Sequence, residues 1–382
     1  MRRLPLLAGL FAALTLSACS GSSAPKRWVA TDLGTLGPSF VTSGAADVNE
    51  SGQIVGGCGT GSLGRAFIWQ RGKMTALGTL GGLESSASRI NDRGQVIGGS
   101  LTRKPARAHS FLWENGRMID LAPLGARAIN NRGQVVGSGT AAGGREHALL
   151  WEHGQVTDLG TLGGPSSIAL AINDRGQIVG SADTAGGAKH AFLWQHGRMR
   201  DLGTLGGAYA GGSSAVDVND RGQVVGTSWS ATISYGQLGM GEHAFLWEHG
   251  RMRDLGTLGR SPATSMAVAI NDRGEIVGNS PASGDRRPFL WRNGRMIDLG
   301  TLGGGHSEAV AIDDRGRVIG DSVPSGPHGM SHAFVWQDGA MTDLGTLGGF
   351  VSVPTAINAH GEIVGSSNTG SGKAHAVLWT LR

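Results

Sequence analysis

Cysteine, tyrosine and charged side chains are scarce in this chain of 382 residues, which has two Cys, two Tyr and 16% charged residues. Two cysteines cannot build a disulfide framework, so the stability of the fold must come from packing. The formal net charge is +4, and it falls to +2 when the N-terminal Arg2 and Arg3 are not counted. Lysine and arginine are scattered rather than gathered in stripes, so we expect no nucleic-acid partner.

Amphipathic helices and familiar catalytic motifs are also missing. No window keeps an apolar period of 3.6 residues, and 67 glycines are spread through the chain. Each glycine inside a helix would cost roughly 1 kcal/mol, which excludes a helical fold. The sequence has no G-x-S-x-G, no H-E-x-x-H and no glycine-rich phosphate loop before a helix. We therefore expect no catalytic residues and no cofactor.

Instead, the chain repeats one unit between Trp28 and Arg382, and the stretch 168–207 shows it best. This stretch reads I-A-L-A-I-N-D-R-G-Q-I-V-G-S, a short loop, and then H-A-F-L-W-Q-H-G-R-M-R-D-L-G-T-L-G-G. The tryptophan of H-A-F-L-W recurs at intervals of 44, 38, 43, 53, 44, 45 and 43 residues, and N-D-R-G keeps the same phase. Two markers in step indicate eight repeats. The tryptophans are Trp69, Trp113, Trp151, Trp194, Trp247, Trp291, Trp336 and Trp379.

Each unit predicts four short β-strands. Residues 168–172 and 177–179 are apolar runs separated by Asn173-Asp174-Arg175-Gly176, which has the composition of a hairpin turn. Residues 190–194 and 199–202 are again β-prone, and the turn between them contains a glycine. Four strands in about 44 residues are typical of one blade of a β-propeller.

The side chains predict how the strands are placed in a blade. His190, Phe192 and Trp194 share one face of their strand while Ala191 and Leu193 share the other, so neither face is plainly solvent-exposed. A blade packed between two neighbours has this property. The first strand of each unit carries small residues, and blades converge towards the axis, so we place the first strand innermost.

The two ends of the repeat region predict a closed ring. Residues 28–34 match a fourth strand but precede the first unit, whereas the last unit ends at 375–382 without a fourth strand. If the N-terminal strand pairs with the third strand of the last unit, the ring closes without an unpaired edge. We therefore predict an all-β, eight-bladed β-propeller of four-stranded blades over residues 27–382.

The N-terminal segment predicts a signal peptide at residues 1–18. A basic start is followed by an apolar run from residue 4 to residue 16, shorter than the roughly 20 residues needed to cross a bilayer. Leu16-Ser17-Ala18-Cys19 resembles the lipobox of bacterial lipoproteins. That resemblance implies cleavage before Cys19 and lipidation of its sulfur; an ordinary secretory signal with an incidental Cys19 is the alternative.

Residues 19–26 would then form the lipidated cysteine and a short, flexible tether. This arrangement predicts an extracytoplasmic protein of the cell envelope that is held to a membrane by lipid. Ser20, rather than Asp, follows the cysteine and favours the outer membrane in a bacterium that has two membranes.

Turns and loops predict two different faces of the ring. Turns within each pair of strands, first to second and third to fourth, are short and nearly constant, so the face that carries them (the turn face) should be shallow. Loops between the second and third strands, and connectors from one unit to the next, vary in length and lie on the opposite face (the loop face). Recognition usually occurs on variable loops of a rigid scaffold. The longest predicted loops are 227–242, 321–331 and 100–108.

Candidate ligand-binding residues lie in these loops and connectors. Trp229 and Tyr235 occupy the longest loop, where they could stack on a sugar or a peptide. The alternative is that Trp229 packs its own loop onto the rim. The remaining candidates are Tyr209, His328, Arg103, Lys104 and Arg107.

A histidine begins the third strand of six units, and Arg65 and Arg287 replace it in the other two. One histidine per unit cannot bring three or four ligands within about 2.1 Å of one metal ion. We expect each histidine to bond within its blade or to the next one, with the aspartate of the D-L-G segment as the suggested partner. The histidines are His109, His147, His190, His243, His332 and His375.

Calcium is the other metal considered. Residues 47–52 and 217–222 faintly resemble the Asp-x-Asp-x-Asp-Gly loops of integrin-type propellers, but no acidic residue completes the ligand set. Hairpin turns explain both segments more simply. Asp47 and Asn49 remain the candidate metal ligands.

The repeat region resembles the bacterial HAF-repeat family, a class of probable extracellular repeat proteins. The resemblance is visible in His190-Ala191-Phe192, His243-Ala244-Phe245 and His332-Ala333-Phe334, and in D-L-G-T-L-G-G and I-N-D-R-G-Q-I-V-G. It implies an extracytoplasmic repeat protein and supplies no catalytic residues. Ala122-Pro123 in the third connector departs from the pattern.

Together these features predict a lipid-anchored binding or scaffold module without catalytic activity. Its partners would be the membrane, through the anchor, and a glycan or an envelope protein bound at the loop face. Two alternatives stay open. One is a propeller hydrolase or lyase acting on an extracellular polymer, and the other is an assembly subunit of an envelope complex.

Overall fold

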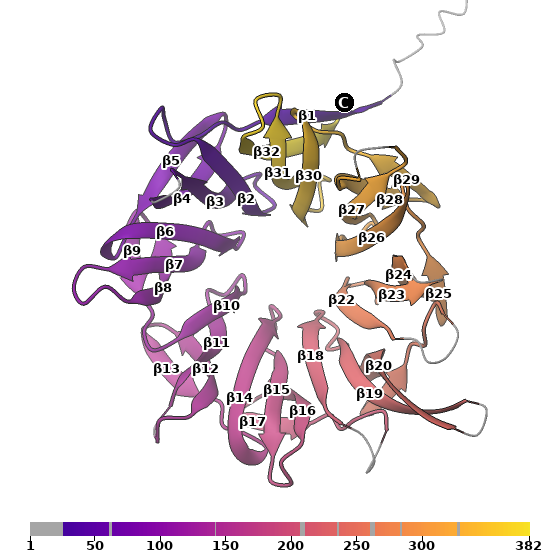
Figure 1. The fold of residues 1–382 in the computed structure, drawn as a ribbon. Helices are drawn as coiled ribbons and strands as arrows, with labels where there is room; N and C mark the ends of the chain where they lie inside the picture. Colours follow the sequence, from indigo (N-terminus) through magenta and orange to yellow (C-terminus); the bar gives the residue numbers. More distant parts are fainter. Residues whose placement is uncertain are drawn as a thin grey trace, which may run out of the picture.

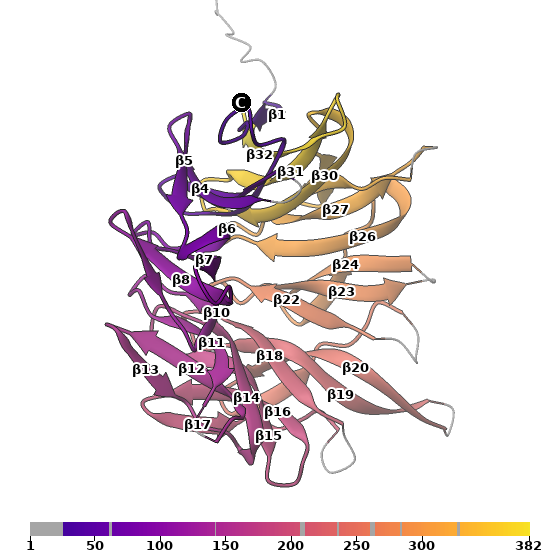
Figure 2. The ribbon, with the colours of Figure 1, turned by 60° about the vertical axis from the view of Figure 1, so that its left-hand side comes forward.

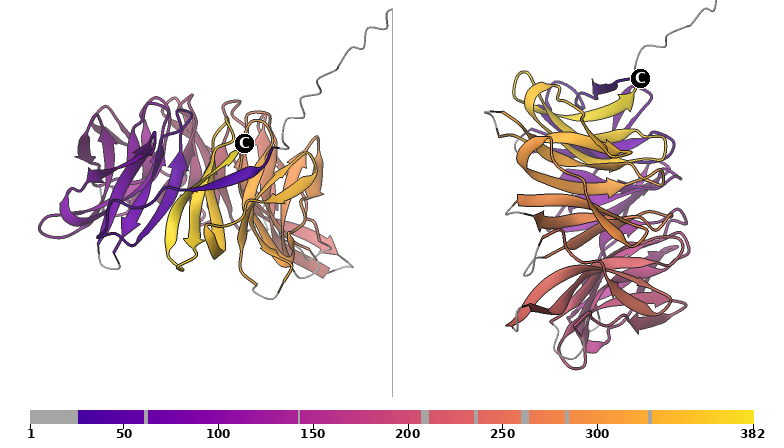
Figure 3. Two further views of the ribbon diagram at one scale, coloured as in Figure 1. Left: turned by 90° about the horizontal axis from the view of Figure 1, so that it is seen from above. Right: turned by 90° about the vertical axis from the view of Figure 1, so that its right-hand side faces the viewer.

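The computed structural model of the protein is an all-β ring of eight four-stranded antiparallel sheets (Figure 1). It describes residues 26–60, 63–141, 143–206, 211–234, 237–259, 264–282, 285–326 and 329–382. Each sheet forms one blade, and the blades follow one another around a central axis (Figures 2 and 3). The predicted eight-bladed β-propeller is therefore confirmed. No helix in the described part of the chain is long and apolar enough to cross a membrane.

Blades 1 to 4 follow the chain in order. Blade 1 contains β2 (Thr42–Val48), β3 (Ile54–Gly59), β4 (Gly64–Gln70) and β5 (Lys73–Gly78). Blade 2 contains β6 (Gly81–Ile90), β7 (Val96–Thr102), β8 (Ala108–Glu114) and β9 (Arg117–Asp120). Blade 3 contains β10 (Gly125–Ile129), β11 (Val135–Thr140), β12 (Glu146–Glu152) and β13 (Gln155–Asp158). Blade 4 contains β14 (Gly163–Ile172), β15 (Ile178–Thr184), β16 (Lys189–Gln195) and β17 (Arg198–Asp201).

Blades 5 to 8 complete the ring. Blade 5 contains β18 (Ser213–Val218), β19 (Val224–Ser234), β20 (Gln237–Glu248) and β21 (Arg251–Asp254). Blade 6 contains β22 (Met266–Ile270), β23 (Ile276–Ala282), β24 (Asp285–Arg292) and β25 (Arg295–Asp298). Blade 7 contains β26 (Gly303–Ile312), β27 (Val318–Pro324), β28 (His332–Gln337) and β29 (Ala340–Asp343). Blade 8 contains β30 (Gly348–Ile357), β31 (Ile363–Thr369), β32 (Ala374–Leu381) and the N-terminal β1 (Trp28–Asp32).

Tight turns join the third and fourth strands of seven blades. In each turn a non-glycine residue with φ between 49° and 52° is followed by a glycine with positive φ, as in His196 and Gly197. Two successive positive φ values are typical of a type I′ turn, whose twist matches that of the flanking strands. The turn glycines predicted from the sequence therefore have a conformational role.

A glycine in the second strand of every blade lets the first strand bulge against it. The first strand shifts register opposite this glycine, as between Ala169 and Ala171 in blade 4. A Cβ at Gly180 would lie 2.0 Å from the carbonyl oxygen of Ile168, and the equivalent distances in the eight blades are 1.9–2.1 Å. Only glycine fits such a close approach, which explains the repeated I-V-G sequence.

The apolar cores lie between blades, because each blade buries both of its faces. One core combines Val179 and Leu193 of blade 4 with Val224, Phe245 and Trp247 of blade 5. Fully burying one such side chain stabilises the fold by roughly 1.5–3 kcal/mol, so each blade depends on its neighbours. The first strands surround the axis and the fourth strands form the rim, as predicted (Figure 1).

The N-terminal strand closes the ring. β1 pairs with β32 in antiparallel register, with Trp28 opposite Leu381 and Thr31 opposite Leu378. Leu33, just beyond β1, joins the core between blades 8 and 1, which also contains the buried Cys58. The closure predicted from the two chain ends is therefore confirmed.

The prediction of a loop at residues 227–242 is wrong, because β19 and β20 extend through most of this segment as one long hairpin. Their register continues from Val224 opposite Trp247 to Ser234 opposite Gln237. The hairpin projects beyond the neighbouring blades (Figure 1). The predicted loops 100–108 and 321–331 are shorter than expected, since β7 continues to Thr102 and β27 continues to Pro324.

Proline substitutions in β1 test the closure. The backbones of Arg27 and Arg382 exchange two hydrogen bonds. Because bonded and non-bonded pairs alternate along an antiparallel ladder, the N–H of Thr31 points towards β32 and that of Ala30 points away from it. Thr31→Pro should destabilise the ring by at least ~1 kcal/mol more than Ala30→Pro, because only the first loses a ladder bond.

Thermal unfolding measures this difference, and the reaction of the Cys58 thiol with a thiol reagent reports opening of the closing core. We expect faster reaction in Thr31→Pro than in Ala30→Pro. Equal melting temperatures and equal thiol reactivity in the two variants would contradict the closing role of β1.

Candidate functional sites on the two faces

On the turn face, an asparagine in the turn after each first strand bonds both its own turn and the next blade. In blade 4, Asn173 Oδ1 accepts hydrogen bonds from the N–H groups of Arg175 and Gln177. Its Nδ2 donates to Gln177 Oε1 and, across the junction, to the carbonyl of Asn219. Seven blades make this inter-blade bond at 2.9–3.0 Å. The motif interpreted as a hairpin turn therefore also bonds each blade to the next.

Blade 7 makes the connection with a different pair. Asp313 stands where the other blades have asparagine, and Arg317 stands where they have Gln or Glu. Arg317 Nε donates to Asp313 Oδ2 at 2.6 Å, and its Nη2 donates to the carbonyl of Ala359 in blade 8 at 3.0 Å. Both side chains are at most 9% exposed. An ion pair thus replaces the amide pair without losing the bond between blades.

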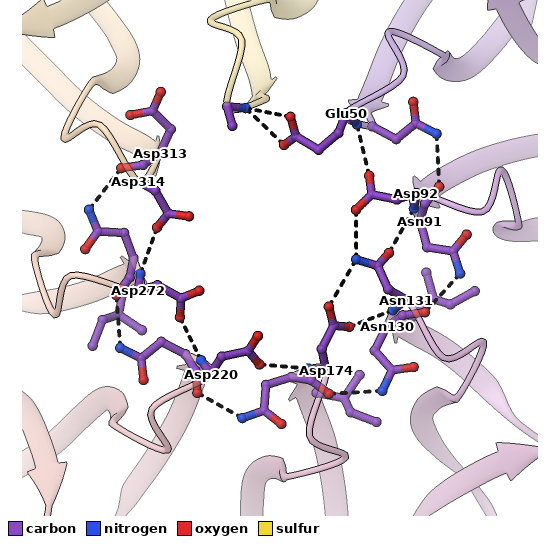
Figure 4. Close-up of a pocket in the computed structure, with 18 of the residues that line it drawn as sticks. Glu50, Asn91, Asp92, Asn130, Asn131, Asp174, Asp220, Asp272, Asp313 and Asp314 are labelled. Carbon is purple, nitrogen blue, oxygen red and sulfur yellow. Dashed lines mark hydrogen bonds between the residues drawn. The ribbon is translucent and has the colours of Figure 1, made fainter.

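The second residue of each of these turns points towards the axis. Its side chain accepts a hydrogen bond from the backbone N–H of the equivalent residue in the preceding blade, at 2.7–3.0 Å, across seven of the eight junctions (Figure 4). Between blades 7 and 8, Ala359 supplies no such acceptor. The ring comprises Glu50, Asp92, Asn131, Asp174, Asp220, Asp272, Asp314 and Ala359.

These side chains surround an axial hollow of about 390 Å³. The expectation of a shallow turn face is therefore wrong, because eight inward-pointing turns leave a space between them. Burial raises the pKa of Asp220, and the neighbouring carboxylates of Asp272 and Asp174 raise it further. The next residue in six of the turns is an exposed arginine, so the acidic ring is balanced by basic side chains. Those arginines are Arg93, Arg132, Arg175, Arg221, Arg273 and Arg315.

Asp47 and Asn49, the candidate calcium ligands, hold blades 1 and 2 together. Asp47 accepts hydrogen bonds from the backbone N–H groups of Val48 and Ile90, each at 3.0 Å. Burial raises its pKa from 3.8 to about 6, despite the opposing charge of Arg89. Asn49 makes the turn contacts already described for Asn173. In the described residues, no group of three or more His, Cys, Asp or Glu is placed to hold a metal ion.

The repeated histidines bond to the D-L-G aspartates, as the sequence suggested. Nδ1 of each histidine lies 2.8–2.9 Å from a carboxylate oxygen of its aspartate, and in blade 8 His375 reaches Asp32 of β1. The same aspartates accept the N–H of the residue two positions on, at 2.7–2.9 Å. These pairs tie the third strand to the fourth strand and its exit. They are distributed around the ring, one in each of six blades.

The sequence-based candidates on the loop face are only partly described. Trp229 lies in β19 and is 36% exposed. Arg103, Lys104 and Arg107 are exposed in the loop between β7 and β8. Cys19, Tyr209, Tyr235 and His328 lie outside the described residues. Trp229 is therefore the predicted aromatic residue that the structure describes.

Trp229 borders a groove between blades 4 and 5. The groove measures about 430 Å³ and is lined by residues 212–214 of blade 5 with Thr227, Ser228 and Trp229 above them. Lys189 of blade 4 and Glu242 of blade 5 flank it. The indole packs closely on the backbone of Gly211, since a Cβ there would lie 2.8 Å from Trp229 Cδ1. An aromatic face, hydroxyls and charges of both signs thus meet in one concave site.

Most large apolar side chains that are exposed in the described residues lie on the loop face. They lie at or near the start of first strands, in the extended second strand of blade 5, or in the loops before third strands. Those on the loop face are Val41, Leu63, Leu83, Trp229, Met266, Met330 and Phe350, and the two elsewhere are Val156 and Leu381. Exposed apolar surface concentrated on one face is typical of an interaction surface. The turn face, by contrast, presents mostly charged side chains.

Comparisons with known proteins give the fold a context. No family model and no curated protein matches the chain. Similar solved structures include dipeptidyl peptidase 4 from Porphyromonas gingivalis, at 9% identity and a TM-score of 0.47, with 76% of this chain and 52% of that chain covered. This chain therefore spans about half the length of the peptidase.

Two smaller proteins are also similar. TolB from Acinetobacter baumannii has 10% identity and a TM-score of 0.33, with 75% of this chain and 80% of that chain covered. AofleA from Arthrobotrys oligospora has 13% identity and a TM-score of 0.33, with 73% and 90% covered. These similarities are too weak to indicate an activity.

The ion pair of blade 7 can be tested by exchanging it for the amide pair. Arg317→Gln alone leaves the buried Asp313 carboxylate without its partner and removes the bond to Ala359. It should cost about 3 kcal/mol. Adding Asp313→Asn recreates the arrangement of the other blades and should recover all but ~1 kcal/mol of that loss. Urea unfolding of both variants measures the difference. If the double variant is as unstable as Arg317→Gln, the two arrangements are not equivalent.

Proposed function

We propose that the protein is a non-catalytic binding module of the bacterial cell envelope, that it is anchored by lipid on Cys19, and that it belongs to the HAF-repeat family. Its loop face would recognise a glycan, with the groove between blades 4 and 5 as the contact. The observation that carries the proposal is the partly exposed indole of Trp229 at the edge of that groove. A ligand bound there would contact two blades.

The chemistry of the groove suits a saccharide. The apolar faces of sugar rings stack on aromatic side chains, and their hydroxyls need hydrogen-bonding partners. Trp229 offers the first, and the carboxylate of Glu242 offers an acceptor. Lys189 offers a donor from an ammonium group that also binds Asp183 at 2.7 Å. A volume of about 430 Å³ lies in the range of roughly 300–1,000 Å³ for small-molecule sites. We therefore favour a glycan over a folded protein, which would need a larger and flatter surface.

The turn face is a weaker candidate for ligand binding. Its axial carboxylates already accept backbone hydrogen bonds from the neighbouring blades, and adjacent arginines balance their charge. Those side chains are committed to holding the ring together. Groove residues such as Trp229 can change without breaking such a bond.

A glycan array probed with the full-length protein in detergent tests the proposal. We expect binding to at least one saccharide, and Trp229→Ala should weaken it at least tenfold, equivalent to about 1.4 kcal/mol. Val156→Ala is the control, because it removes an exposed apolar side chain from the fourth strand of blade 3, away from the loop face. It should leave binding unchanged.

Two results would contradict this prediction. Equal binding by Trp229→Ala would remove the groove from consideration. Capture of envelope proteins, with no signal on any glycan, would favour a protein ligand instead.

The anchor has its own test. Cys19→Ser should move the protein from the membrane fraction to the soluble fraction, because a diacylglyceryl group provides the stable attachment. Mass spectrometry of the N-terminal peptide should show lipid on Cys19 only. Cys58→Ser is the control and should stay at the membrane, since Cys58 is buried in the ring. Membrane attachment that survives Cys19→Ser would overturn the anchor.

A further inference from the structure

The groove beside Trp229 has an equivalent between blades 1 and 2. The first groove is lined by residues 212–214 and 227–229. Lys189 and Glu242 flank it, and each of them directly precedes the third-strand histidine of its blade. The second is lined by residues 84–86 and 99–101, with Gly64 and Ala108 at its flanks. Strand register makes these the same positions, since Ser213 pairs with Ser228 as Ser85 pairs with Ser100.

Hydrogen bonds fix the floor of both grooves in the same way. Ser213 Oγ accepts the N–H of Ala191 in the preceding blade at 2.8 Å, and Ser85 Oγ accepts that of Ala66 at 3.0 Å. A second serine in each groove accepts the N–H of a connector leucine at 2.9 Å. The serines that shape the floor therefore also bind the blades together. The groove is a product of the repeat itself.

A third groove, between blades 2 and 3, includes the same eight positions. It is lined by residues 123–125 and 138–140, with Ala108 and Glu146 at its flanks, and it extends further to Arg107. Its volume is about 690 Å³, against about 430 Å³ beside Trp229 and about 260 Å³ between blades 1 and 2. Ala122-Pro123, which departs from the repeat sequence, lies in this wall.

Two other junctions carry larger side chains at one of these positions. Ile168 occupies the position of Ser214 between blades 3 and 4, because Ile168 pairs with Ser181 as Ser214 pairs with Thr227. Glu308 occupies it between blades 6 and 7, and it forms an ion pair with Arg286 of the preceding blade. Ile168 and Glu308 are larger than Ser86, Gly125 and Ser214, which hold this position in the three grooves.

We propose that the ring is multivalent and binds saccharide units of one class in three equivalent grooves, at the junctions of blades 1 and 2, 2 and 3, and 4 and 5. This inference rests on the proposed function and adds the number and position of the sites. The grooves occupy the same positions of the repeat. Two of them share the serine floor, whereas Leu124 and Gly139 stand at the serine positions of the third. Their lip residue is Leu101, Thr140 or Trp229. The groove with Trp229 binds most tightly, because only it offers an aromatic face.

Multivalency suits a ligand with repeated units. Weak contacts in separate grooves combine on a polymer or a surface, and linked sites commonly raise the overall affinity 10²–10⁴-fold. All three grooves open on the loop face, so a single repetitive surface can engage them together. A free monosaccharide gains nothing from this arrangement.

Filling the grooves one at a time tests the inference. Each groove is filled by placing isoleucine at the position that Ile168 occupies between blades 3 and 4. The three variants are Ser86→Ile, Gly125→Ile and Ser214→Ile. Val353→Ile is the control, since Val353 pairs with Ser366 at the equivalent position between blades 7 and 8. Native mass spectrometry of the full-length protein, released from detergent, counts bound methyl glycosides of hexoses, N-acetylhexosamines and 6-deoxyhexoses. Circular dichroism verifies that each variant is folded.

We expect three bound copies in the wild-type protein and in Val353→Ile, two in each single variant and none in the triple variant. Retention on a polymer that displays the same glycoside should fall at least 100-fold in the triple variant. One bound copy, lost only in Ser214→Ile, would overturn the multivalent ring and leave the proposed function standing. No binding of any glycoside, together with an empty glycan array, would overturn the proposed function itself.

Discussion

Contact between neighbouring blades is the constraint on which the whole structure depends. Among the described residues, each apolar cluster draws side chains from two blades, so a blade shares its core with its neighbours. The same junctions are crossed by the turn asparagines, the axial carboxylates and the buried serines. A blade is therefore stable only between two others, and the first and last blades must meet. The pairing of β1 with β32 supplies that contact.

Much of this architecture could be predicted from the sequence, because the repeat amplifies each local signal eightfold. The strand order, the inner position of the first strand and the closing role of residues 28–34 all followed from recurring residue types. The extended hairpin at 227–242 did not, because its residues occur in one unit only and a variable segment resembles a loop. The replacement of Asn and Gln by Asp313 and Arg317 was visible in the sequence. That Arg317 bonds to the next blade became clear only from the position of the Ala359 carbonyl.

The two faces differ in how many of their side chains form hydrogen bonds between blades. Turn-face residues satisfy backbone groups of adjacent blades, so their side chains recur with little change. That is also why the axial ring escaped detection in the sequence. A hairpin turn alone explains the N-D-R-G sequence. The ring formed by its second residue appears only when the eight units are arranged around an axis. Grooves on the loop face were equally hidden, since each needs walls from two units.

The recurrence of the grooves follows from the same division. Serines such as Ser85 and Ser213 cannot change easily, because their hydroxyls join two blades across a buried junction. The lip residues Leu101, Thr140 and Trp229 make no such bond with their side chains in the described structure, so they can differ from junction to junction. A ring built in this way repeats its concave sites at fixed positions and varies the side chains that line them, as Leu124 and Gly139 show at the serine positions between blades 2 and 3. Recognition can then be altered at one junction while the contacts that hold the ring together stay intact.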